Sequence, residues 1–199
     1  MLQTPLTCSA ALKEWAVAIE ALGEGRQALI IRKGGIREDN GHFEVKFPEF
    51  LLFPSFEHQQ ADLLRPEYAQ ELGHALNAAP DSDSLTFTHF ATVHKAFPVT
   101  EAVELQTLAP HHIWTQEYAE KRLRWKPKVA LTAMVLRVYA LPEPARVPIR
   151  PEYAGCKSWL QLLDTVTVDA VVPAMPDDAF AAEAKAIDDA MAAVTAGAR

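Results

Sequence analysis

The chain has 199 residues, of which 49% are hydrophobic and 23% are charged, so it is long enough to bury one sizeable core. Its formal net charge of -7 argues against a general binder of polyanions. No run approaches the ~18 apolar residues of a membrane span, and the N-terminus lacks a basic stretch followed by an apolar one. We therefore expect a cytoplasmic protein with no membrane partner.

The charge is distributed unevenly. Residues 164–199 hold seven acids against one lysine and one arginine, whereas residues 112–157 hold nine lysines or arginines and four acids. The chain therefore contains a basic segment although its net charge is negative. The two cysteines, Cys8 and Cys156, lie far apart without CxxC spacing, which supports neither a disulfide framework nor a zinc site.

The first predicted element is a helix from Ser9 to Leu22. Ser9 can cap it, and the glycines that follow at 23 and 25 end it. Its apolar positions share one face at i, i+3, i+4 and i+7 spacing: Leu12, Trp15, Ala16, Ile19 and Leu22. A hairpin over the same stretch is the alternative.

Strands and one helix follow. Residues 27–32 form an apolar strand that Gly34 and Gly35 end with a turn, residues 43–47 alternate like a half-exposed strand, and residues 50–53 continue after Pro48. Residues 66–78 are typical of a helix with proline in its first turn. Residues 79–84 form the clearest loop.

The second half is predicted from the same patterns. We expect strands at 85–93 and 101–105, a helix at 111–124, a long strand at 129–141, a proline-punctuated extended segment and a short helix at 153–163. These elements predict an α+β domain over residues 1–164, with a mixed or barrel-like sheet and flanking helices. Residues 165–199 are predicted to be an acidic linker and an amphipathic helix.

The C-terminal helix has apolar residues alternating four and three apart from Phe180 to Val194, beyond Pro176. Two alternatives stay open at this point. The helix packs on its own domain, or it forms the seam of a homo-oligomer or of a complex with another protein.

Arg32 and Lys33 place two cations at a strand end, beside two glycines whose backbone amides can approach an anion closely. The pattern fits phosphate binding, although it is not a P-loop. A basic residue before a hairpin turn is the structural alternative.

Glu57, His58 and Gln59 follow an apolar strand and a proline. His58 could act as a general base next to Glu57, or bond to backbone as a structural histidine. Adjacent residues on an extended chain face opposite ways, so the two side chains need not cooperate.

The densest cluster runs from His112 through Trp114 to Arg122 and Arg124. An aromatic ring next to cations suits single-stranded nucleic acid or a flipped base, whereas a buried Trp114 would simply be core.

Cys156 beside Lys157, Ser158 and Trp159 could be a nucleophile of lowered pKa or a structural free thiol. The histidines show no HExxH or H-x-H spacing, so no metal site is predicted, and no cofactor follows from the sequence.

Six ordered motifs over residues 10–163 resemble a bacterial family of uncharacterised proteins, domain of unknown function 1802. They are residues 11–16, RKGGI at 32–36, FLLFPSFEHQ at 50–59, His112-x-Trp114, LRVY at 136–139 and GCKSW at 155–159. The family transfers no catalytic residues. Some members of the family are associated with restriction-endonuclease-like domains, so the resemblance implies a setting of restriction or DNA metabolism.

A shorter likeness covers about 25 residues. A helix with Trp15, then Gly25, then a strand that ends in Arg32 is similar to the opening of PUA-like and ASCH-type domains. Those domains are small β-barrels that bind RNA or modified bases, which implies a PUA-like sheet here.

The leading hypothesis is nucleic-acid recognition in a restriction or nucleic-acid-processing setting. Phosphate or ligand contacts are predicted for Arg32, Lys33, Gln59, Arg122, Arg124, Arg137, Lys157 and Ser158, and base stacking for Trp114, Tyr139 or Trp159. The alternatives are a small hydrolase or nuclease that uses Glu57, His58, His112 and Cys156, and a non-catalytic interaction subunit.

Overall fold

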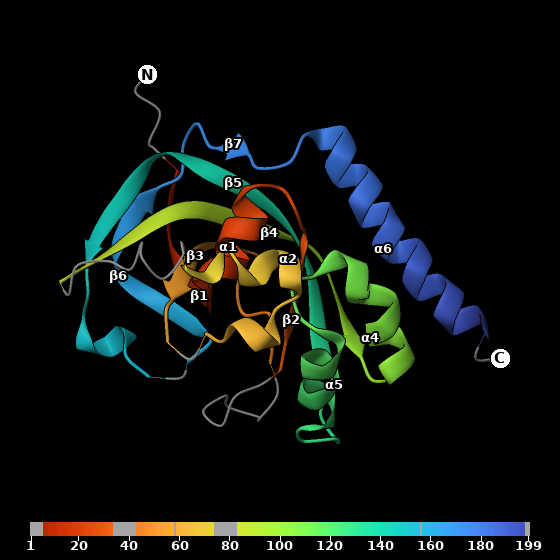
Figure 1. The fold of residues 1–199 in the computed structure, drawn as a ribbon. Coiled ribbons are helices and arrows are strands. Elements are labelled where there is room, and N and C mark those ends of the chain that lie inside the picture. Colours follow the sequence, from red (N-terminus) through yellow and green to blue (C-terminus); the bar gives the residue numbers. More distant parts are fainter. Residues whose placement is uncertain (1–5, 34–42, 58, 74–82, 156, 198–199) are drawn as a thin grey trace.

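The computed structural model describes residues 6–33, 43–57, 59–73, 83–155 and 157–197. Within them the chain forms an open, mixed sheet of seven strands with helices packed around it (Figure 1). The strands are β1 (Thr7–Trp15), β2 (Leu29–Arg32), β3 (Glu49–Ser55), β4 (Ser84–Val99), β5 (Leu131–Pro148), β6 (Trp159–Thr167) and β7 (Val172–Pro173).

The strand order is β2-β5-β4-β3-β1-β6, and β7 pairs with β5 off this path. Only the pair β1 and β3 is parallel; the other described pairs are antiparallel. The two longest strands, β4 and β5, pair along most of their length with register shifts at Phe87/His89 and Val93/Lys95. Such bulges bend a sheet, and Figure 1 shows both strands curving across the molecule. An α+β fold with a mixed sheet is confirmed.

The helices are α1 (Ala16–Gly23), α2 (Pro66–Ala69), α4 (Ala102–Leu108), α5 (Gln116–Arg124) and α6 (Asp177–Gly197), with short 3-10 turns at Ala61–Leu63, Ala109–His111 and Pro151–Tyr153. Among the described residues, no helix has both the length and the apolar composition to cross a membrane.

The predicted helix over residues 9–22 is half wrong. Its first half is strand β1, which pairs with both β3 and β6, and the chain passes directly from β1 into α1. A central strand is buried on both faces, so it carries an apolar run that a helical pattern also fits. The predicted end of the helix at residues 23–25 is confirmed.

Gly25 closes α1 with a Schellman-type arrangement. The Gly25 N–H donates to the Leu22 carbonyl (3.1 Å) and the Arg26 N–H to the Ala21 carbonyl (2.9 Å). Gly25 has φ +68°, and a Cβ there would lie 2.7 Å from the Ala174 carbonyl oxygen. Both the conformation and the close approach require glycine.

We expect Gly25→Ala to lower the free energy of unfolding by about 2 kcal/mol, since an L-residue is strained at that φ and its Cβ meets backbone. Urea denaturation measures the change. Gly73→Ala is the matched control, because nothing lies within 4 Å of a Cβ there, and it should leave stability within about 1 kcal/mol. Equal effects of the two substitutions would contradict the prediction.

Several other predicted elements differ from the observed ones. The predicted strand at 101–105 is wrong, because Glu101 and Glu104 form a capping box that begins α4. The predicted helix at 153–163 is wrong as well, since residues from 159 form β6. Residues 43–47 carry no assigned strand. The predicted helix at 66–78 is α2 in its first turn, and its end at 74–78 lies outside the described residues.

Helix α6 lies along the outside of the molecule next to α4, as Figure 1 shows. Ile187 is fully buried and Ala184 nearly so, in one cluster with Leu105 and Leu108 of α4. Its ion pairs to the body, among the described residues, join Lys95 with Asp188, His111 with Glu183 and Arg137 with Asp177. The helix thus packs on its own chain, which is the first of the two alternatives for it.

Candidate functional site

A cleft of about 990 Å³ opens where β1, β2 and β3 end. Its lining joins residues from four sequence blocks that were predicted to hold site residues and are far apart along the chain. They are Arg32 and Lys33; Phe56 and Glu57; Trp114, Tyr118 and Arg122; and Gly155, Lys157 and Ser158. The volume lies within the range of small-ligand sites. The four blocks therefore border one concavity, which makes it the candidate site.

A buried ion pair forms the polar floor of the cleft. Glu14, the penultimate residue of β1, is 4% exposed, and its Oε2 accepts from Nη1 of Arg32 at 2.9 Å. Its Oε1 accepts from the Trp15 backbone N–H at 2.8 Å. Arg32 also donates from Nη2 to the Ser158 hydroxyl at 3.1 Å, so β1, β2 and the start of β6 are tied together.

An aromatic wall stands next to this floor. The rings of Trp15 and Trp114 meet edge to face with centroids 4.8 Å apart, and Tyr118 lies 5.0 Å from Trp114. Trp114 itself is 8% exposed and belongs to a buried core cluster, as its structural alternative predicts, whereas Trp15 and Tyr118 are half-buried. Burial raises the pKa of Tyr118, so the residue keeps its phenol proton. Phe53 and Phe56 from the end of β3 extend the apolar lining.

Basic side chains dominate the charged lining. Among the described residues, six cations and two carboxylates line the cleft: Lys13, Arg32, Lys33, Arg122, Arg150 and Lys157, against Glu14 and Glu57. Lys13 and Arg150 are engaged, the first with the Tyr153 and Gly155 carbonyls and the second with Asp164. The cleft is therefore positive in an acidic protein.

Lys33 is 3% exposed, and its ammonium donates to the Leu123 carbonyl near the end of α5 at 2.7 Å. Burial lowers the pKa of Lys33, and the charges of Arg122 and Lys126 lower it further. Lys33 thus fixes the basic end of α5 against the cleft. Arg122 and Lys157 also line the cleft, and neither has an ion pair with another described residue.

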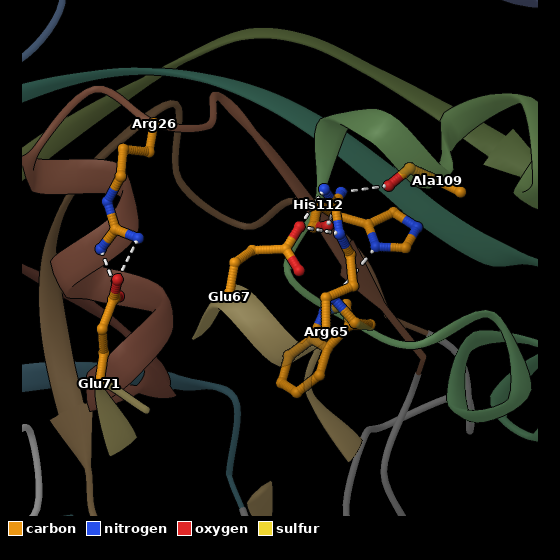
Figure 2. A network of polar contacts seen from close by, with 7 residues as sticks. Arg26, Arg65, Glu67, Glu71, Ala109 and His112 are labelled. Atoms are coloured by element: carbon orange, nitrogen blue, oxygen red, sulfur yellow. Dashed lines mark hydrogen bonds and ion pairs between the residues drawn. The ribbon is translucent and has the colours of Figure 1, made fainter. Parts of the chain in front are cut away.

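Arg65 fixes the backbone segment 109–112, which precedes Trp114 in the chain. Its guanidinium donates to the Ala109 carbonyl at 2.8 Å and the His112 carbonyl at 3.2 Å, while Nε bonds Glu67 at 2.8 Å (Figure 2). A second ion pair in Figure 2, Arg26 with Glu71, joins the end of α1 to the segment after α2.

His112 lies in this segment, is buried and does not line the cleft. It is 1% exposed, its Nδ1 accepts from the Trp114 N–H at 3.2 Å, and its Nε2 has no hydrogen-bond partner among the described residues. Burial lowers the pKa of His112 to about 4, with a smaller contribution from Arg65, so the ring is neutral at pH 7.

The predicted catalytic set is not assembled by the described residues. Glu57 is exposed on the cleft rim, and no hydrogen bond joins it to the buried His112. His58 and Cys156 lie outside the described residues. In the part of the chain that the structure describes, no three His, Cys, Asp or Glu side chains form a group that could hold a metal ion.

Several residues predicted to bind ligand lie elsewhere. Trp159 is core: it is 8% exposed, it packs against Phe43, Phe47 and Phe50, and its Nε1 donates to the Glu44 carbonyl at 2.7 Å. Successive side chains of an extended chain point to opposite faces, so Ser158 and Trp159, at the beginning of β6, point to different sides.

Arg137 and Tyr139 of β5 also lie outside the cleft lining. The Arg137 guanidinium binds the Met175 carbonyl at 2.6 Å and the Asp177 carboxylate, where α6 begins, and Tyr139 packs against Phe90. The Gln59 side chain is bound to the backbone, because its Nε2 donates to the Ser55 carbonyl at 2.7 Å. Arg124 is exposed and lies 3.3 Å from Glu120.

Sequence reasoning missed Glu14 and Trp15. When residues 9–22 are taken as one helix, Glu14 falls on its solvent face. The signal that was present is an acid inside an otherwise apolar stretch, which calls for a buried partner once that stretch is a central strand.

The family model described as "Domain of unknown function" (DUF1802) matches residues 11–186. The chain belongs to this family. No curated protein sequence matches it.

Solved structures of the ASCH protein from Zymomonas mobilis are similar in fold. One mutant overlaps with a TM-score of 0.44 at 11% identity, covering 80% of this chain and 91% of that chain. A second mutant gives 0.41 at 12% identity, covering 77% and 88%. The protein itself gives 0.39 at 9%, covering 90% and 93%. At these TM-scores the likeness is partial, and the cleft of this DUF1802 chain must be interpreted from its own residues.

Proposed function

We propose that this DUF1802 protein recognises nucleic acid and that the cleft receives an unpaired base. The observation that carries the proposal is the meeting of an aromatic wall, a polar floor and basic rim residues in one concavity. A base can stack on Trp15 or Tyr118, and Arg122 and Lys157 can neutralise phosphates beside it. The setting we propose is restriction or other nucleic-acid processing.

The acidic total of the protein does not oppose this function. Glu14 and Glu57 are the only described carboxylates in the lining, and Glu14 is already paired with Arg32. Among the described residues, no acid of α6 lines the cleft, and this helix packs against α4. The local field at the cleft is therefore positive, which raises the local concentration of an anionic ligand.

The test is binding of the full chain to single-stranded and duplex DNA and RNA, measured by fluorescence anisotropy at low salt and at increasing salt. We expect binding that weakens with salt, with a slope of about -0.7 per phosphate contacted in a single strand. The double substitution Arg122→Ala and Lys157→Ala should weaken binding and flatten that slope by about 1.4, because two phosphate contacts are lost.

Lys185→Ala is the matched control, since Lys185 is an exposed lysine on α6 whose partner is Asp189. It should leave both affinity and salt slope unchanged. Absence of binding to any of these nucleic acids at low salt would refute the proposal, and so would a double variant that behaves like the control.

A further inference from the structure

A basic surface continues from the cleft along the end of α5. Residues 121–128 hold five cations and no acid: Lys121, Arg122, Arg124, Lys126 and Lys128. Trp125 stands in the middle of this run, is 38% exposed and does not line the cleft. An exposed indole among cations is not explained by packing of the core.

Two cations flank the Trp125 ring. The Arg122 guanidinium lies 5.5 Å from the ring centroid, and the Lys126 ammonium lies 4.6 Å from it. Arg122 also lines the cleft, so this one side chain belongs both to the cleft and to the surroundings of Trp125. The two features are contiguous.

The position of Trp125 is fixed by backbone on both sides. Its N–H donates to the Lys121 carbonyl at the end of α5, and the Val129 N–H donates to the Lys126 carbonyl across a turn in which Lys126 has φ +52°. The buried Lys33 holds the adjacent Leu123 carbonyl. Cations at a helix C-terminus also favour its dipole, but that effect does not require an exposed aromatic ring among them.

From this arrangement we propose that a single strand of nucleic acid leaves the cleft past Arg122 and stacks a second base on Trp125. The inference rests on the proposed function of the cleft and adds to it the form of the ligand: a single strand of several nucleotides, and not a mononucleotide or a duplex. A duplex keeps its bases stacked on one another, whereas a single strand presents a free base face to an exposed indole.

The experiment compares wild type, Trp125→Ala and Trp125→Phe in binding single strands from one to about ten nucleotides long. For wild type, affinity should rise with length. Trp125→Ala should lose about 5- to 150-fold for the longest strands and nothing for the mononucleotide, because the loss of one stacked base has that size. Trp125→Phe should retain most of the affinity, since a phenyl ring still stacks.

The inference would be overturned by equal binding of wild type and Trp125→Ala at every length, by an equal loss at every length including the mononucleotide, or by duplex binding as tight as that of the single strand. Wild type that binds a mononucleotide and longer strands equally well would also overturn it while leaving the function of the cleft intact. Wild type that binds no nucleic acid at all would refute the proposed function itself, so the two failures are distinguishable.

Discussion

Glu14→Ala is expected to lower the free energy of unfolding by about 3 kcal/mol, as measured by urea denaturation at pH 7. Glu14 is 4% exposed, and its carboxylate is bound by Arg32 at 2.9 Å and by the Trp15 N–H at 2.8 Å. Its removal leaves the Arg32 guanidinium in the cleft floor with a hydroxyl as its main partner. We place the loss at the low end for buried pairs because Arg32 keeps 17% side-chain exposure.

Glu24→Ala is the matched control for this prediction. Glu24 also pairs with an arginine, Arg26, at 2.7 Å, but its side chain is 56% exposed. An exposed pair contributes between 0 and about 1 kcal/mol, so the control should change stability only slightly. A Glu14→Ala loss no larger than that of Glu24→Ala would show that the floor pair is not a structural requirement.

Stability should fall by about 3 kcal/mol as the pH is lowered from 6.5 to 4, because of His112. The pKa of His112 is about 4 in the folded protein, against the ordinary histidine value of 6.5 in the unfolded chain. Between these values the unfolded chain binds a proton that the folded chain does not, so falling pH favours unfolding. The loss of stability due to His112 should be complete below pH 4 and absent above about pH 7.

The measurement is the free energy of unfolding as a function of pH for wild type and for His112→Asn, whose side-chain oxygen can still accept from the Trp114 N–H. The variant should have a flatter profile between pH 4 and 6.5. His94→Asn, at an exposed histidine next to Phe180, should keep the wild-type profile. The attribution to His112 would be wrong if wild type and His112→Asn changed in parallel.

Much of the candidate site could be predicted from residue types at strand ends. Arg32, Lys33, Trp114, Arg122, Lys157 and Ser158 were expected near a ligand, and all six line the cleft. For Arg32 and Lys33 the reason is general, because polar and charged residues directly after an apolar strand lie at the edge of a sheet. Lys157 and Ser158 directly precede β6, and Trp114 and Arg122 reach the cleft from the region of α5. Their roles in binding stay predictions.

The rest depended on tertiary pairing that local patterns do not encode. Leu12, Trp15 and Ile19 fit a helical face, yet Leu12 pairs in a central strand and Ile19 belongs to α1. The same limit explains residues 101–105, where an apolar pattern of five residues fits a strand and a capping box decides for a helix. Trp159 and Arg137 have the chemistry of a binding site but serve the core and the attachment of α6.

The direct passage from β1 into α1 constrains how this cleft can diversify. Glu14 and Trp15 end a strand with hydrogen-bonded neighbours on both sides, and a helix begins at the next residue, so no loop separates them from the core. Substitutions there alter the fold together with the ligand. On the rim, Glu57 and Lys157 are exposed and Arg122 is half-buried. Relatives with different ligand preferences should therefore differ at the rim while keeping the floor, because only rim changes leave stability intact.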